Sequence, residues 1–169
     1  MRLDFGYRDL THEALEDLLR KTPHLDRVTH LDVFDNQIGD EGLKALIDAL
    51  YAAQSPLQSL DIGANQIHDP GAAALITSPV LVGIKELNLA FNKLTDLTAF
   101  ELARSPHLTA LRALHLTGNA ISEQGAIAMA NSAYLKHIAL LCLSEEHITD
   151  VGFQAFQRSP YLQGAVHWE

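Results

Sequence analysis

Asn88, His115 and Cys142 come closest to a catalytic set in this chain, because each follows the previous one by 27 residues. A thiol, an imidazole and a carboxamide placed side by side are the groups of a cysteine-dependent hydrolytic triad. Such a triad also needs a pocket and oxyanion donors, which an open row of equivalent residues does not supply. We therefore expect Cys142 to be a small packing residue and the chain to be no enzyme.

Asp4, Asp32 and Asp61 occupy the equivalent positions before Asn88 in the same column, and three neighbouring carboxylates could hold a cation. Calcium prefers six or more oxygen ligands, which side chains on a flat surface rarely supply. The nine histidines show neither an HExxH motif nor pairs spaced four residues apart. No GxxxxGK[ST], GxGxxG or GxSxG motif occurs. We expect no metal ion and no cofactor.

This column exists because the chain repeats one eleven-residue pattern, apolar-x-x-Leu-x-apolar-x-x-Asn-x-apolar. The pattern covers residues 28–38, 57–67, 84–94 and 111–121. Its asparagines recur every 27 to 29 residues, at Asn36, Asn65, Asn92 and Asn119. A period of this length indicates a stacked solenoid rather than a single globular core.

Each repeat predicts a short strand, a turn and a helix. The apolar residues of Leu31-x-Val33 and its equivalents alternate with period two, which is typical of a half-buried strand. Helix starts are indicated by Asp69-Pro70 and by the cap candidates Thr95, Ser122 and Thr149. Small residues that let neighbouring helices approach follow six places after the asparagine position, at Gly42, Gly71, Thr98, Gly125 and Gly152.

The repeated asparagines are predicted to be structural. A side-chain amide at the inward end of a strand can satisfy backbone N–H and C=O groups in its own turn and in the adjacent one, which leucine cannot do. Stacked in register, the four asparagines would form a ladder of side-chain amides through the molecule.

We expect one domain spanning residues 1–169. Residues 1–27 are expected to form an N-terminal capping repeat, residues 28–137 four regular repeats, and residues 138–164 a degenerate fifth repeat with Glu146 in the asparagine position. Residues 165–169 are expected to form a partial final strand, with Trp168 equivalent to the strand leucines. An exposed sheet edge would allow either a monomer or an edge-mediated homo-oligomer.

The units resemble the ribonuclease-inhibitor-like class of leucine-rich repeat proteins. The Ile38-Gly39-Asp40-Glu41-Gly42 and Ser-Pro-x-Leu segments look like short bacterial versions of that class. The resemblance implies an α/β fold, a right-handed solenoid with a parallel sheet on the concave side and helices on the convex side, and a function in binding proteins. As an alternative, it implies a GTPase-activating or other regulatory protein acting through a solenoid edge. The candidate arginines for that role are Arg8, Arg27, Arg104, Arg112 and Arg158.

The composition and the net charge indicate which kinds of partner and which cellular compartment to expect. The formal charge of −9, from 21 acidic against 12 Lys and Arg residues, disfavours binding to nucleic acid. Cys142 is the only cysteine, so no internal disulfide can form and a reducing interior is indicated. The start of the chain lacks the apolar segment of a signal peptide, and no stretch is long and apolar enough to span a membrane. We expect a cytoplasmic protein with no membrane contact.

The outward residues of successive strands predict a binding face. Exposed aromatic rings among carboxylates are typical of a contact surface and favour a partner with a basic surface, although solvated aspartates and scattered apolar residues would also fit. The sheet outlines only about 400–500 Å², against about 800 Å² per partner in a standard interface, so contacts must extend onto the turns. The predicted contacts are Tyr7, Asp32, Phe34, Asp35, Asp61 and Phe91, with Lys85, Glu86, Arg112 and His115 as rim or specificity residues.

Overall fold

The computed structural model describes residues 1–168, which form one seven-stranded parallel sheet and six α-helices. The strands are β1 (Arg2–Asp4), β2 (His30–Asp32), β3 (Ser59–Asp61), β4 (Glu86–Asn88), β5 (Ala113–His115), β6 (Leu140–Leu143) and β7 (Val166–Trp168). The helices are α1 (His12–Lys21), α2 (Gly39–Ala52), α3 (Asp69–Ile76), α4 (Asp96–Arg104), α5 (Glu123–Ala130) and α6 (Asp150–Gln157). The 3-10 helices η1 (Leu25–Arg27), η2 (Pro79–Gly83), η3 (Pro106–Ala110) and η4 (Ala133–Leu135) precede β2, β4, β5 and β6.

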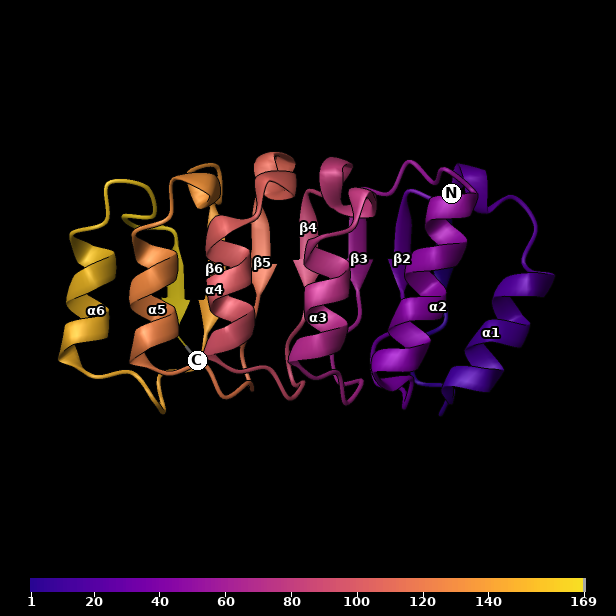
Figure 1. The fold of residues 1–169 in the computed structure, drawn as a ribbon, viewed down its shortest axis with the longest axis horizontal. Helices are drawn as coiled ribbons and strands as arrows, with labels where there is room; N and C mark the ends of the chain where they lie inside the picture. The colour runs from indigo at the N-terminus through magenta and orange to yellow at the C-terminus, as the bar shows by residue number, and fades with distance from the viewer. Residues whose placement is uncertain (169) are drawn as a thin grey trace.

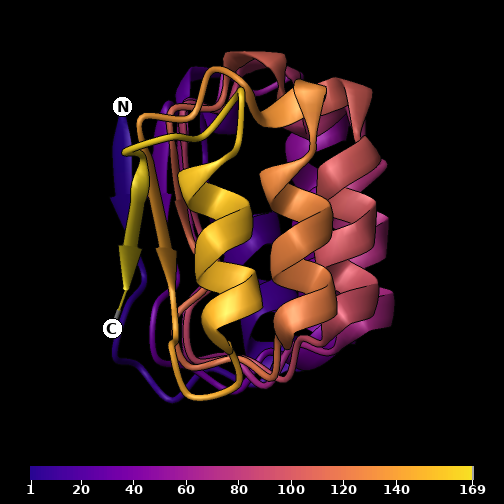
Figure 2. The same cartoon turned by 90° about the vertical axis from the view of Figure 1, so that its left-hand side faces the viewer.

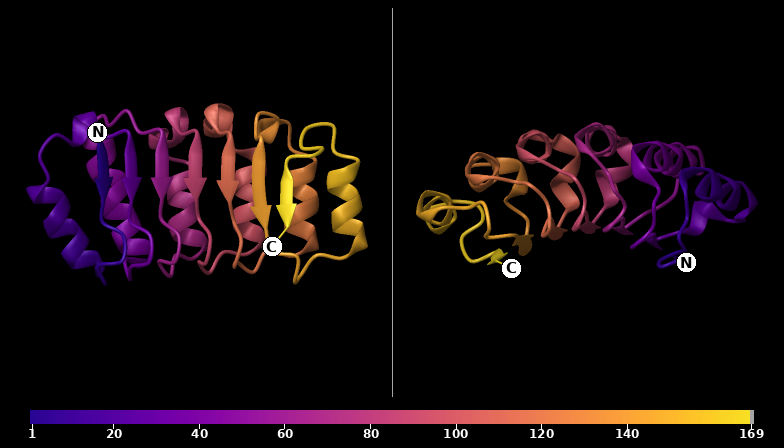
Figure 3. Two further views of the ribbon diagram at one scale, coloured as in Figure 1. Left: turned by 180° about the vertical axis from the view of Figure 1, so that it is seen from behind. Right: turned by 90° about the horizontal axis from the view of Figure 1, so that it is seen from below.

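The elements form two layers, with the helices along one side and the strands along the other (Figures 1 and 2). Each unit runs along a strand, returns through a helix and moves one place along the stack, which makes a right-handed coil. Viewed along the strands, the stack is an arch with the sheet on its inner side (Figure 3). The predicted α/β solenoid with a concave sheet and convex helices is confirmed.

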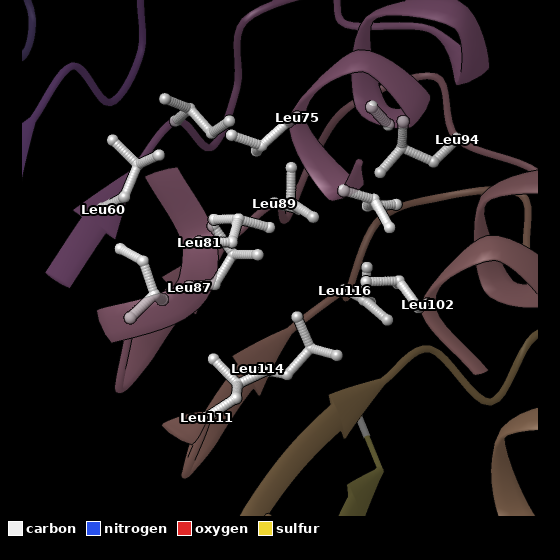
Figure 4. Close-up of a cluster of buried hydrophobic side chains, with 14 of the residues drawn as sticks. Leu60, Leu75, Leu81, Leu87, Leu89, Leu94, Leu102, Leu111, Leu114 and Leu116 are labelled. Carbon is white, nitrogen blue, oxygen red and sulfur yellow. The ribbon is translucent and has the colours of Figure 1, made fainter. Parts of the chain in front are cut away.

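The strands pair in the predicted register in β1 to β6. One inward column contains Leu31, Leu60, Leu87, Leu114 and Leu141, all of them buried. Figure 4 shows Leu60, Leu87 and Leu114 of this column in the same buried cluster as Leu75 of α3 and Leu102 of α4. Because full burial of a leucine stabilises a fold by about 1.5–3 kcal/mol, this column contributes strongly to the cohesion between the two layers.

The last strand departs from the expected register. Trp168 pairs with Leu143, and Val166 takes the place beside Leu141, so the prediction that Trp168 is equivalent to the strand leucines is wrong by two residues. Because the shift is two residues, the Trp168 side chain still points toward the helices. There its ring meets Phe153 and Phe156 of α6 edge-on, with centroids 4.5 and 5.4 Å away. Aromatic packing under the last helix therefore sets this register.

The helix starts confirm the cap candidates and correct one of them. Side-chain oxygens of Thr95, Ser122 and Thr149 accept hydrogen bonds from the first turns of α4, α5 and α6. In α3 the N-cap is His68, with no side-chain cap, and Asp69 is the first helical residue. The Asp69 carboxylate instead accepts hydrogen bonds from the backbone N–H groups of Thr95 and Thr98 in the next unit. Capping thus crosses from one repeat to the next, which a single-repeat reading misses.

Small residues between adjacent helices are required, as predicted. A Cβ atom on Gly125 would lie 2.5 Å from the Asp96 Oδ1 atom and 2.9 Å from the Ala99 Cβ atom. Thr98 is tolerated at the equivalent position in α4 because its hydroxyl donates a 2.6 Å hydrogen bond to Asp69. The small residues therefore leave room for the carboxylate of the preceding unit.

Candidate functional site

The asparagine ladder forms the inner support of the concave face. The Asn92 amide donates to the carbonyls of Ile62, Leu89 and Ala90, at 3.1, 3.0 and 3.3 Å. Its Oδ1 atom accepts the backbone N–H groups of Asn65 and Ile67, both at 3.0 Å. The four ladder asparagines, Asn36, Asn65, Asn92 and Asn119, are all buried. Each bonds to backbone groups of its own unit and of its neighbours.

Two ladder positions differ from this pattern. Asn65 donates to Val33 and Gly63, both at 2.8 Å, but its buried Oδ1 atom has no hydrogen-bond partner among the described residues. The turn of the preceding unit differs from the others. Its Gly39 N–H donates to the backbone carbonyl of Asn65, and none of its N–H groups donates to the Asn65 side-chain oxygen. In the last position Glu146 is exposed to solvent. The ladder of amides therefore ends at Asn119.

The aspartates of the concave face carry a structural task that the sequence reading missed. The column Asp4, Asp32, Asp61 and Asn88 is in register on β1 to β4. Each side-chain oxygen in it accepts the N–H of the residue two places on, at 2.8 to 3.0 Å, and so fixes the turn that follows the strand. Asn88 performs the task without a charge, so the turn itself does not require the three negative charges.

The pKa of Asp61 is raised by its position in this column. Burial raises the pKa of its carboxyl group, and the neighbouring Asp32 charge adds to the increase, against opposing hydrogen bonds from Gly63 and Asn88 and the opposing charge of His115. Like charges on adjacent strands destabilise a sheet. A positive group from outside the chain would relieve that repulsion.

The raised pKa of Asp61 predicts a specific pH dependence. Because the native state holds this proton more tightly than the unfolded chain, the group costs stability as pH rises from its unfolded pKa through its folded pKa. Asp61→Asn keeps an oxygen for the Gly63 N–H. We expect the variant to gain unfolding free energy relative to wild type as pH rises from about 3 to 7, measured by urea melts at each pH.

The matched control for this experiment is Asp69→Asn. Burial raises the Asp69 pKa, but hydrogen bonds from Thr98 and Thr95 outweigh it and hold the pKa below its usual value. Its stabilising contribution is present above the unfolded pKa and is lost as pH falls through the folded pKa. This control should therefore lose stability relative to wild type as pH rises. The same sign for both variants would contradict the account.

Three aromatic rings, those of Tyr7, Phe34 and Phe91, lie on the sheet side of the molecule beyond the ends of their strands. Tyr7 and Phe91 are 73% and 58% exposed, and Phe34 is half-buried. The Tyr7 and Phe34 rings are in contact, with centroids 5.3 Å apart. The Phe34 ring lies over Gly63 and the Phe91 ring over Gly118, so each ring leans on a glycine of the following unit. The rings therefore cover the face along the stack instead of projecting singly.

The backbone beneath two of these rings is unusual. Tyr7, Asp35, Ala64 and Phe91 occupy one column and have positive φ angles, from 53° to 56°. Gly118 fills the same position in the next unit, with φ of 71°. Bulky residues in this left-handed region cost roughly 1–2 kcal/mol each, and glycine avoids that cost. Tyr7 and Phe91 thus carry local backbone strain that a glycine at the same position would avoid.

Replacing Phe91 by glycine should therefore not harm the fold. We expect the unfolding free energy to stay unchanged or rise by up to about 1 kcal/mol, because relief of the left-handed backbone offsets the lost ring contacts. Phe91→Ala loses the ring but keeps the strain, so it should be the less stable variant. Urea unfolding followed by circular dichroism compares them, and a glycine variant less stable than the alanine variant would contradict the prediction.

A hollow of about 480 Å³ opens beside Phe91, beyond the ends of the strands. Its lining includes the predicted residues Asp35 and Phe91, together with Asp9, Gln37, Gln66 and Lys93, which sequence reasoning missed. The signal for the missed four was present, because each directly follows the asparagine position or its equivalent. The hollow extends the face onto the turns, where the small sheet area requires contacts.

The structure places the predicted rim residues apart from the aromatic group. Arg112 donates to the carbonyls of Thr109, Ala110 and Leu111 beneath its own strand. Lys85 bonds Gln58 and lines a groove near the start of β4, at the opposite ends of the strands from the Phe91 hollow. Glu86 is exposed at the first position of β4, and His115 is half-buried on β5 in the aspartate column. Of these four residues, only His115 lies in the column that contains Asp32, Asp61 and Asn88.

The alternative chemistries gain no supporting geometry. Asn88, His115 and Cys142 are in register, but the Asn88 amide bonds Asp61 and Ala90, and Cys142 is only 4% exposed. Within residues 1–168, no three His, Cys, Asp or Glu side chains gather as a metal site would require.

Three of the candidate arginines make contacts with other groups of the same chain. Besides Arg112, Arg104 pairs with Glu101, and Arg8 donates to the Asp4 carbonyl while its guanidinium lies 5.5 Å from the centre of the Phe5 ring. Those guanidinium groups already have partners.

The stacked units, the amide ladder and the open concave face define a leucine-rich repeat solenoid. The family model described as Leucine Rich repeat matches residues 28–46, 53–75, 84–103 and 105–130, more than half of the chain. This protein belongs to the leucine-rich repeat family, whose members generally serve as protein-interaction modules. A comparison with curated proteins found no match. None of the helices in the described part of the chain has the length and apolar character needed to cross a bilayer.

Proposed function

We propose that this protein is a non-enzymatic module that binds a partner protein through the concave sheet face and the adjoining turns. The unit length, with a full helix in each repeat, supports a place in the ribonuclease-inhibitor-like class of the family. The single buried cysteine suits a reducing compartment, and we propose the cytoplasm.

The main support for the proposal is a comparison of equivalent positions in different repeats. Some repeats carry a charge or an aromatic ring at a position where another repeat shows that the fold does not require it. In the aspartate column Asn88 fixes its turn without a charge, whereas Asp32 and Asp61 carry one. In the left-handed column Gly118 fits without strain, whereas Phe91 does not. The negative charges and rings are additions to the structural minimum, and they gather on one face. A basic, partly apolar protein surface complements them.

The test compares two double variants with matched loss of exposed side chains. Phe34→Ala combined with Phe91→Ala removes rings from the concave face. Tyr51→Ala combined with Leu97→Ala removes two side chains, each 62% exposed, from the helices of the convex side. Immobilised wild type first captures interacting proteins, and each captured protein is then purified and titrated against all three proteins by biolayer interferometry.

We expect the concave variant to weaken binding at least tenfold, because aromatic residues at the centre of an interface commonly contribute more than 1 kcal/mol each. The convex variant should bind like wild type. Binding that survives the concave changes and is lost with the convex ones would overturn the proposal. Unfolding free energies of both variants, measured alongside, exclude loss of fold as the cause.

A further inference from the structure

The hollow beside Phe91 combines residues from four successive units. Asp9 comes from the first, Asp35 from the second, Ala64 and Gln66 from the third, and Phe91 and Lys93 from the fourth. Because the units stack in chain order, the small Ala64 side chain lies between Asp35 on one side and Phe91 on the other. That arrangement leaves a recess about 480 Å³ in volume between a carboxylate and an aromatic ring.

The charges that border this recess are not neutralised within the described residues. Asp9 and Asp35 are exposed, and none of the ion pairs formed within residues 1–168 involves either of them. Lys93 is the only cationic residue in the lining, and it lies on the Phe91 side. Two carboxylates therefore face one ammonium group, and the Asp35 side of the recess favours a cation.

The opposite border offers a ring face. Phe91 borders the recess on one side and leans on Gly118 on the other, so its ring is held in place while remaining mostly exposed. A guanidinium group stacks on such a ring through its flat face and can bond a carboxylate through its edge at the same time. An ammonium group is a compact, strongly hydrated charge and cannot do both equally well.

We propose, building on the concave-face function, that the recess over Ala64 receives an arginine side chain of the partner protein. Its guanidinium stacks on Phe91 and pairs with Asp35, and Asp9 adds long-range attraction. Gln37 and Gln66 also line the recess, and a side-chain amide of either type can offer a carbonyl oxygen to the guanidinium N–H groups. The occupant is a side chain from a loop or extended segment, because the recess opens onto the turns.

The test uses defined probes and needs no identified partner. Isotope-labelled protein is titrated with the tripeptides Ac-Gly-Arg-Gly-NH₂, Ac-Gly-Lys-Gly-NH₂ and Ac-Gly-citrulline-Gly-NH₂ while amide NMR spectra are recorded. We expect the arginine peptide to give saturable shifts at Ala64, Gln66 and Phe91, with a dissociation constant on the order of millimolar. The lysine and citrulline peptides should bind more weakly, because each lacks either the planar group or the charge.

Substitutions that suit the backbone locate the site without disturbing the fold. Asp35 has a φ of 54°, a conformation that asparagine tolerates well, so Asp35→Asn removes only the charge. We expect it to weaken arginine binding about threefold, as loss of an exposed ion pair implies. Phe91→Gly should weaken binding by a similar factor. The control Asp48→Asn changes an exposed carboxylate on α2 and should leave binding unchanged.

Failure of this inference can be told apart from failure of the proposed function. Shifts scattered over other acidic surfaces, equal binding of the lysine peptide, or an unchanged constant in Asp35→Asn would overturn the arginine recess. If the concave double variant still loses its protein partner in that case, the binding face stands and only its chemistry is wrong. If the tripeptide result holds but partner binding ignores the concave changes, the recess is not the site of partner binding and both proposals fall.

Discussion

Replacing Asn92 by alanine is expected to lower the unfolding free energy by about 3 kcal/mol. The side chain takes part in five hydrogen bonds with backbone groups of two units, and a buried group left without its partner costs roughly 1–3 kcal/mol. Relaxation of the turns recovers part of the sum. Urea denaturation at pH 7, with the change in midpoint read at constant slope, measures the loss.

Asn65 supplies the comparison for this experiment within the same ladder. Its Oδ1 atom has no partner in the described residues, so Asn65→Ala abandons only the two bonds donated by the amide nitrogen. We expect a loss of about 1 kcal/mol. If both alanine variants lose the same free energy, hydrogen bonding does not account for the asparagine positions. A pair of variants with no measurable loss would refute the ladder altogether.

The second large effect is expected at Gly125, where two opposing tendencies meet. Alanine is the better helix former by about 1 kcal/mol, so an isolated helix would gain from Gly125→Ala. In the stack the added Cβ atom would press on Asp96, Ala99 and Ile121, with separations of 2.5 to 2.9 Å. Overpacking of this kind costs about 1–3 kcal/mol. Displacement of Asp96 would also weaken its bonds to Ser122 and Gly125.

We therefore expect Gly125→Ala to destabilise the protein by about 2 kcal/mol in thermal and urea unfolding. Gln124→Ala in the same turn is the control, because Gln124 is exposed whereas Gly125 is buried. That variant should stay within about 0.5 kcal/mol of wild type. A stabilised Gly125→Ala protein would show that the helices α4 and α5 can separate freely.

The sequence predicted the fold well because each repeat restates the same constraint. Period-two leucines and the asparagine interval define strand, turn and return, and these agree with the pairing of β1 to β6. The prediction failed where the constraint came from outside the unit. Asp69 caps the next helix rather than its own, and Trp168 follows the rings of α6 rather than the repeat interval.

The candidate face was predictable only in part. Register aligned Tyr7 and Phe91 in one column after the strands, but alternation alone does not account for their exposure, because both lie in the left-handed turn that follows the strand. Register could not reveal that the aspartates fix their own turns, because that depends on backbone geometry after the strand. Register also could not show that Lys85 and Arg112 lie away from the aromatic rings. The spacing of residues along the sequence does not show which acceptors a long side chain will reach.

The end of the amide ladder at Asn119 has a consequence for motion. Within residues 1–168, the hydrogen bonds between units join each unit to its immediate neighbours, so resistance to opening is local and adds up along the array. Past Asn119, the exposed Glu146 makes no such bond within the described residues. The last units are joined instead by the pairing of β6 with β7, the hydrogen bond from Ser159 Oγ to the Ala130 carbonyl and the ring contacts of Trp168. Backbone hydrogens there should exchange with deuterated solvent through partial opening, while those around Asn92 wait for global unfolding.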